Sequence, residues 1–140
     1  MHYFYRIEFY PMSRNVFLID DDNDDRNIFQ FVLTTIDNTA SLTSAQDGVH
    51  AFELINGNGF TKPDIIFLDL NMPRMNGIEF LTEIRKMKEF EGIPVIIFST
   101  NIMKEQAAQC KELGALECVT KPDTVETQIG VMKELLKKYT

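Results

Sequence analysis

The sequence predicts an α/β fold in which a five-stranded parallel sheet carries helices on both faces. Short runs of consecutive apolar residues alternate along the chain with stretches whose apolar residues recur at helical spacing. Runs that are apolar at every position indicate strands covered on both faces, as in parallel sheets. Turn-forming residues, among them Pro63, Gly92 and Pro94, separate the segments. Strands that alternate with helices are joined by right-handed crossovers, which place the sheet between two helix layers.

Three of the predicted strands are four-residue apolar runs rich in β-branched and aromatic residues, and two weaker candidates contain more polar residues. In chain order the predicted strands cover residues 16–19, 40–45, 65–68, 95–98 and 116–120. Five strand–helix units of this kind favour the flavodoxin-like strand order 2-1-3-4-5.

Five helical segments follow these strands, and each carries an apolar stripe that predicts a face packed on the sheet. Gly114 suits a left-handed cap at the end of the fourth helix. The predicted stripes are Ile28, Phe31, Val32 and Ile36; Val49, Phe52 and Ile55; Ile78, Leu81 and Ile84; Met103, Ala107, Cys110 and Leu113; and Val125, Ile129, Met132 and Leu136.

Length and charge limit the classes of function. The 140 residues suit one domain, which we place at residues 14–140; residues 1–13 are an extension of unknown role, and Met12 is a second possible start. A net charge of −7 repels phosphate backbones and anionic lipids, so we expect neither direct nucleic acid binding nor a membrane partner. The two cysteines do not have the spacing of a metal site, and we interpret both as small core residues of a protein in a reducing cytoplasm. The sequence predicts no membrane span and no output domain.

Polar side chains gather where the predicted strands end. In this fold ligands bind at the carboxyl ends of the strands, where the strand order reverses between the first and third strands. The residues that the strands bring to this edge are Asp20, Asp21, Asp22, Asp69, Ser99, Thr100 and Lys121.

The chemistry of these groups points to a hard cation and a phosphoryl group. Carboxylates packed together repel one another, and Mg²⁺, which prefers oxygen ligands, removes that conflict. A rigid carboxylate at Asp69 beside the cation is a suitable nucleophile toward phosphorus. Ser99 and Lys121 are suitable ligands for the other phosphoryl oxygens, and Lys121 is expected to pair with Asp69 beforehand. Asp22, like Asp24 and Asp25 after it, is better explained as a cap of the following helix.

The chain resembles the receiver domains of two-component response regulators over residues 15–138. Any one of the shared motifs is weakly specific, whereas all of them in order, with the key residues at predicted strand ends, are strongly specific. The motifs are residues 16–22 (VFLIDDD), 66–73 (IFLDLNMP), 75–77 (MNG), 94–99 (PVIIFS) and 121–122 (KP).

The resemblance implies a stand-alone phosphoacceptor signalling protein, CheY-like, rather than an enzyme. A histidine kinase or a phosphotransfer protein would donate the phosphoryl group, and a downstream protein target would read the result. The Lys121–Pro122 bond is often cis in the family. The resemblance implies that Asp69 is the phosphoacceptor, Ser99 the switch hydroxyl and Lys121 the signature lysine. It implies as Mg²⁺ ligands Asp20, Asp21, Asp69 and the Asn71 backbone carbonyl. Of the acid pair Asp20 and Asp21, Asp21 is the more direct ligand.

One departure concerns the switch. In the family the hydroxyl moves toward the phosphoryl group, and the face formed by the fourth helix, the fifth strand and the fifth helix changes shape. An aromatic residue usually takes part three positions before the lysine, but here that position is Cys118. We interpret Cys118 as a packing residue without a second cysteine to pair with. An interaction module of the same fold that works without phosphorylation therefore stays open as an alternative.

Other interpretations of the acidic run fit less well. An aspartate-dependent phosphatase needs Thr or Val where Asp24 stands, although Asp20 and Asp22 have the right spacing. An EF-hand needs Gly at Asp25 and Glu at Phe31, and no strand before it. A nucleotide or flavin binder of this fold needs a Gly-rich loop after the first strand, which is absent.

Overall fold

The computed structural model describes residues 13–140, so the predicted extension lies outside the described residues apart from Ser13. One parallel sheet has the order β2-β1-β3-β4-β5, which confirms the predicted fold class and strand order. The strands are β1 (Asn15–Ile19), β2 (Ser41–Ala45), β3 (Ile65–Leu68), β4 (Val95–Ser99) and β5 (Glu117–Thr120).

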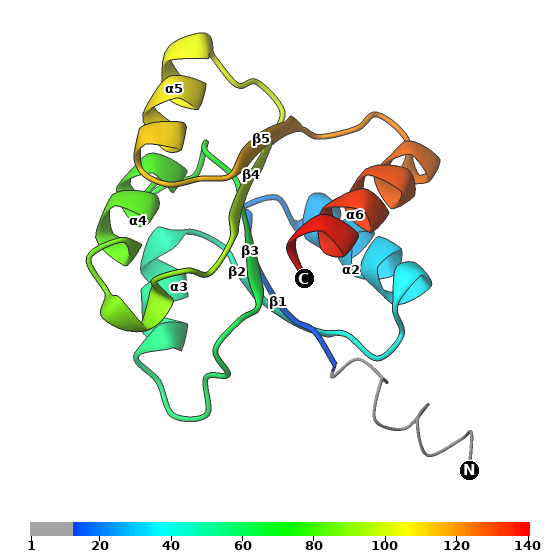
Figure 1. Ribbon diagram of the computed structural model, residues 1–140, viewed down its shortest axis with the longest axis horizontal. Helices are drawn as coiled ribbons and strands as arrows, with labels where there is room; N and C mark the ends of the chain where they lie inside the picture. The colour runs from blue at the N-terminus through cyan, green and yellow to red at the C-terminus, as the bar shows by residue number, and fades with distance from the viewer. Residues whose placement is uncertain (1–12) are drawn as a thin grey trace.

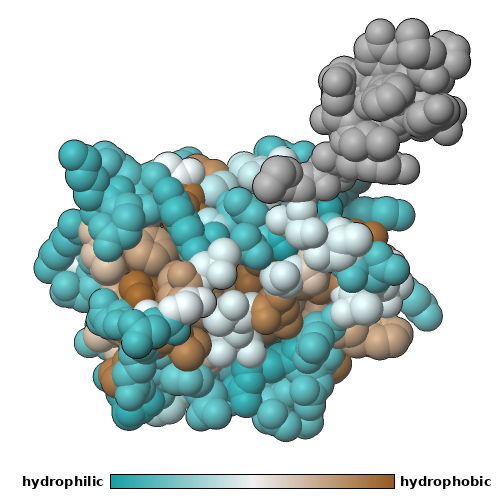
Figure 2. All heavy atoms as spheres, turned by 90° about the horizontal axis from the view of Figure 1, so that it is seen from below, coloured by the Kyte–Doolittle hydropathy of each residue, from teal (hydrophilic) through white to brown (hydrophobic). Residues whose placement is uncertain are grey.

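Two helix layers enclose the sheet, with α2 and α6 on one face and α3, α4 and α5 on the other (Figure 1). Because successive side chains of a strand point to opposite faces, the buried strands supply both cores by alternation. The helices are α2 (Asn23–Ile36), α3 (Gly48–Ile55), α4 (Gly77–Ile84), α5 (Lys104–Glu112) and α6 (Val125–Tyr139), with a short 3₁₀ turn, η1 (Lys88–Phe90). Figure 2 shows one face of the molecule, where hydrophilic side chains dominate and hydrophobic ones form separate patches.

An aromatic cluster ties α2 to the middle of the sheet. The Phe29 ring lies 5.0 Å from that of Phe67 on β3 and 6.0 Å from that of Phe98 on β4, measured between centroids. The rings meet edge to face, which is the arrangement that aromatic quadrupoles favour. The cluster fixes the position of α2 on β3 and β4.

The predicted core stripe of α2 was wrong in part. Phe29 and Leu33 are buried with Val32, whereas Phe31 is 61% exposed and Ile28 is 37% exposed. A residue turns about 100° around a helix, so the contiguous apolar stretch around position 31 allows two adjacent faces. Packing against both the sheet and α6 selects the face centred on Val32. Two further predicted core residues, Met103 and Val125, are exposed.

The two cysteines differ in burial. Cys110 on α5 is fully buried, as predicted, but Cys118 on β5 is exposed. Because β5 is an edge strand, only part of its surface is covered by helices. Burial, and then the neighbouring Cys118 thiol, raise the pKa of Cys110 to about 11, so the prediction that no second cysteine lies near Cys118 was also wrong.

Candidate functional site

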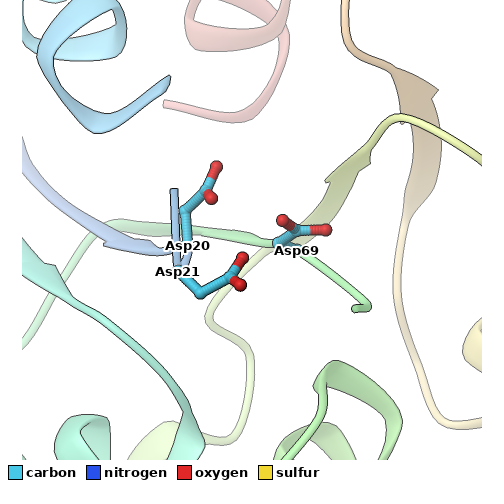
Figure 3. A group of neighbouring side chains, drawn as sticks. All are labelled: Asp20, Asp21 and Asp69. Atoms are coloured by element: carbon cyan, nitrogen blue, oxygen red, sulfur yellow. The ribbon is translucent and has the colours of Figure 1, made fainter. Parts of the chain in front are cut away.

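An acidic cluster lies beyond the ends of the two central strands. Asp20 directly follows β1 and Asp69 directly follows β3, and the Asp69 N–H donates to the Ile19 carbonyl oxygen over 2.9 Å. Asp20, Asp21 and Asp69 each present one carboxylate oxygen within 4.8 Å of the others (Figure 3). Asp20 and Asp69 are buried, whereas Asp21 is exposed at the mouth of the cluster.

The cluster is electrostatically unfavourable as it stands. Burial raises the pKa of Asp20 from 3.8 to about 6, because the bonds to Lys121 and to the Asp22 N–H offset only part of the desolvation. Burial and the charge of Asp69 also raise the pKa of Asp21. Two carboxyls that hold their protons more tightly than usual mark a place where added positive charge is favourable.

Lys121 supplies the positive charge that pairs with the carboxylates of this cluster, while Arg26 Nη1 donates to the backbone carbonyl oxygen of Asp20 over 2.7 Å. Its Nζ lies 2.7 Å from Asp20 Oδ2, 2.8 Å from Asp25 Oδ2 and 3.3 Å from Asp69 Oδ2. Burial lowers the Lys121 pKa, but the bonds to Asp20 and Asp25 outweigh it, and the pKa lies above its usual range. Lys121 therefore stays charged and holds together three carboxylates, which lie just after β1, just after β3 and in α2.

Two details here differ from the sequence interpretation. Asp25 was assigned only to the helix start, yet its carboxylate binds Lys121; the distant pairing leaves no local signal in the sequence. The Lys121–Pro122 peptide bond is trans rather than cis, and the Lys121 N–H donates to the Ser99 carbonyl oxygen over 2.9 Å. Asp22 is the N-cap of α2, as predicted, and accepts from the Asp25 N–H.

Ser99 meets the carboxylate of Asp69 from the other side. This fully buried hydroxyl donates to Asp69 Oδ1 over 2.5 Å and accepts from the Leu70 N–H over 3.4 Å. The two oxygens of Asp69 therefore have different partners, with Ser99 on Oδ1 and Lys121 on Oδ2.

The loop after Asp69 closes the site. The Asn71 N–H donates to Asp69 Oδ1 over 3.4 Å, and the Gly77 N–H donates to the Leu70 carbonyl oxygen over 2.9 Å. A Cβ at Gly77 would lie 2.2 Å from the Asp69 carbonyl oxygen, so only glycine permits this approach. The loop from Leu70 to Asn76 thus returns to the end of β3 before α4 begins.

These groups suit a hard divalent cation. The three oxygen donors converge, no histidine or cysteine belongs to the group, and burial raises the pKa of both Asp20 and Asp21. The structure brings together Asp20, Asp21, Asp69, Ser99 and Lys121, and Asn71 lies beside them in the loop.

Comparison with known proteins identifies the family. The model of the response regulator receiver domain matches residues 16–131. A chemotaxis protein CheY homologue of Campylobacter jejuni is 31% identical over 120 residues, which are 86% of this chain and 87% of that protein. The chain belongs to the response regulator receiver domain family, and its class is that of phosphoacceptor signalling proteins.

Solved structures give the same result. The phosphorylated cyanobacterial phytochrome response regulator RcpA has a TM-score of 0.84 at 25% identity and covers 91% of this chain and 94% of its own. The Mn²⁺-bound form of response regulator Rcp1 has a TM-score of 0.75 at 26% identity, covering 88% of this chain and 91% of its own.

Other relatives are much longer. The sensor histidine kinase CheAY of Helicobacter pylori is 33% identical over 127 residues, 91% of this chain but 15% of that protein. A protein-glutamate methylesterase/protein-glutamine glutaminase of Treponema denticola is 36% identical, and the chain spans 32% of it. The chain therefore matches only a part of each of these two proteins.

Proposed function

We propose that this receiver domain, assigned to residues 14–140, accepts a phosphoryl group on Asp69 in a Mg²⁺-dependent reaction. The observation that carries the proposal is the surrounding of Asp69: a buried carboxylate with a hydroxyl on one oxygen, an ammonium on the other, and two further carboxylates within ligand distance. No role is assigned to residues 1–13.

Mg²⁺ would be held by the carboxylates of Asp20, Asp21 and Asp69 and by the Asn71 backbone carbonyl. Oxygen ligands and several retained waters are the usual environment of this ion. The Mn²⁺-bound form of Rcp1 supports a divalent cation in a related protein. When bound, the ion neutralises charge on the phosphoryl oxygens.

The phosphoryl group would come from a phosphohistidine of a histidine kinase or phosphotransfer protein. An oxygen of Asp69 attacks phosphorus, the P–N bond breaks, and the imidazole leaves with its electron pair. The Lys121 ammonium already contacts the Asp69 carboxylate, and it then pairs with the negatively charged phosphoryl oxygens. The Ser99 hydroxyl then donates to a phosphoryl oxygen instead of Oδ1, and this exchange of partners switches a docking surface for a downstream protein.

The proposed setting is the cytoplasm, where kinases of this type phosphorylate their partners. Among the described helices none is both long and apolar enough to cross a membrane. Net charge −7 supports protein partners rather than nucleic acid. Apart from gaining and losing its own phosphoryl group, the protein is proposed to catalyse no reaction.

Intact mass spectrometry after incubation with acetyl phosphate and Mg²⁺ tests the proposal. We expect a gain of one phosphoryl group in the native chain, and none in an Asp69→Asn variant or with EDTA. A gain that persists in Asp69→Asn would refute the acceptor assignment. No gain from either acetyl phosphate or a phosphorylated kinase would favour the interaction module that works without phosphorylation.

A further inference from the structure

An ion pair ties the loop after Asp69 to the start of α3. Arg74 Nε donates to Asp47 Oδ2 over 2.8 Å, and Arg74 Nη2 donates to Asp47 Oδ1 over 3.0 Å. Two parallel bonds between a guanidinium and a carboxylate fix orientation as well as distance. The Asp47 side chain is 5% exposed, so this carboxylate has little access to water that could replace Arg74.

Asp47 does more than cap a helix. As the N-cap of α3 it accepts the His50 N–H on Oδ1 over 2.8 Å, which needs only one oxygen. The other oxygen, Asp47 Oδ2, accepts a hydrogen bond from Arg74 Nε. The hydrogen bonds from the Arg74 guanidinium are the largest influence on the Asp47 pKa. They lower it, which keeps the carboxylate charged. A cap alone would not require a buried carboxylate with a cation on it.

The backbone at Arg74 adopts an unfavourable conformation where this ion pair forms. Arg74 has φ 62°, and no other residue except glycine in residues 13–140 has a positive φ. A long side chain rarely adopts that conformation unless its surroundings impose it. The next residue is held as well, because the Gly48 N–H donates to the Met75 carbonyl oxygen over 3.1 Å.

Met75 closes the contact between the loop and α3. A Cβ built on Gly48 would lie 2.6 Å from Met75 Cγ, so the methionine packs directly on the glycine backbone. The loop is therefore fixed at two places, at Gly77 against the end of β3 and at Arg74–Met75 against the start of α3. Asn71 lies between the end of β3 and the second of these attachments.

We propose that Arg74 and Asp47 are positioning residues for the cation site. Their ion pair holds the loop so that the Asn71 backbone carbonyl stays beside Asp69, and its loss weakens Mg²⁺ binding and slows phosphoryl acceptance. This inference rests on the proposed function, in which that carbonyl is a Mg²⁺ ligand. Neither residue contacts the acidic cluster itself, so the effect travels through the loop backbone.

Arg74→Gly is the decisive variant, because glycine adopts positive φ freely and removes the ion pair without adding strain. Arg74→Lys keeps the charge but not the two parallel bonds, and Asp47→Asn keeps an oxygen that can cap α3. Arg14→Gln is the matched control, since Arg14 pairs with Asp37 over 2.7 Å away from the site. Each full chain is titrated with Mg²⁺ by calorimetry, phosphorylated with acetyl phosphate, and melted to verify folding.

We expect Arg74→Gly to raise the Mg²⁺ dissociation constant and lower the phosphorylation rate by about tenfold, the lower end for groups that orient metal ligands. Arg74→Lys and Asp47→Asn should fall between it and the native chain, and Arg14→Gln should match the native chain. A folded Arg74→Gly with native Mg²⁺ affinity overturns the inference while leaving the proposed function intact. If the native chain gains no phosphoryl group, the proposed function fails, whereas the Mg²⁺ affinities still test the ion pair.

Discussion

The Ser99 hydroxyl lies 2.5 Å from Oδ1 of Asp69 and donates a hydrogen bond to it. In the switch expected for this family the hydroxyl moves toward the phosphoryl group, but here it already points to the carboxylate without one. The position that usually carries the aromatic part of that switch holds the exposed, smaller Cys118. Under the proposed function, the hydroxyl would need little movement to reach a phosphoryl oxygen on Asp69.

Removing this hydroxyl tests its role. In Ser99→Ala the phosphoryl oxygens lose a placed donor, and we expect phosphorylation by acetyl phosphate to slow on the order of 10²-fold. Ser99→Thr, which keeps the hydroxyl, should restore most of the rate. Rates from intact mass against time decide it; an unchanged rate in Ser99→Ala would exclude a role for the hydroxyl in the reaction.

Lys121 is predicted to balance the acidic cluster in the absence of metal. Lys121→Met leaves Asp20, Asp25 and Asp69 without their shared cation, so the free energy of unfolding should fall by about 3 kcal/mol in EDTA and recover partly with Mg²⁺. Urea unfolding measures both values. Lys138→Met is the control, since the Lys138–Glu117 pair is largely exposed and should cost less than about 1 kcal/mol. Equal losses in the two variants would contradict a special role for Lys121.

The raised pKa of Asp20 sets a pH dependence. The folded chain keeps a proton on Asp20 up to about pH 6, whereas an ordinary aspartate loses it near 3.8. Between these values the folded state binds more protons, so this group's contribution to stability is lost as the pH rises. Metal binding requires the ionised carboxyl, so Mg²⁺ affinity should rise with pH up to about 6, by at most about tenfold per unit.

Calorimetric Mg²⁺ titrations and urea unfolding in EDTA, each at about pH 5 and about pH 7, measure both effects. Asp20→Asn should flatten the stability difference relative to the native chain. Mg²⁺ affinity that falls as the pH rises over this interval would be inconsistent with Asp20 as a ligand.

Two glycines offer a matched pair of substitutions. Gly77→Ala places a Cβ 2.2 Å from the Asp69 carbonyl oxygen, and we expect a loss of about 3 kcal/mol and weaker Mg²⁺ binding. Gly130 lies within α6 with nothing within 4 Å of its would-be Cβ, so Gly130→Ala should gain about 0.5 to 1 kcal/mol. Thermal unfolding of both variants is the measurement; tolerance of alanine at Gly77 would show that the loop can move away from β3.

Most of the sheet could be predicted from the sequence, because the buried strands are runs of consecutive apolar residues. The run at 65–68 became β3 without change, and the acids at the ends of β1 and β3 meet as expected for neighbouring parallel strands. The core face of α2 was missed because Phe31 and Val32 belong to a contiguous apolar stretch, and only the packing of α6 decides between faces.

The partners of the site residues were harder to predict. The pairing of Asp25 with Lys121 joins groups 96 positions apart, and it depends on how α2 lies relative to the turn after β5. The Arg74–Asp47 ion pair depends on a positive φ at a residue other than glycine, which no residue preference predicts. Contacts that depend on loop conformation leave no periodic pattern in the sequence.

The aromatic cluster of Phe29, Phe67 and Phe98 links the site to α2 by direct side-chain packing. Phe98 immediately precedes Ser99 on β4, and its ring packs on Phe29 of the helix that carries Asp25. A displacement of the end of β4 that followed the Ser99 hydroxyl would therefore change the contact between Phe98 and Phe29 on α2. Under the proposed function, this packing would give a route from Asp69 to the helix layer opposite α5 that needs no aromatic side chain at position 118.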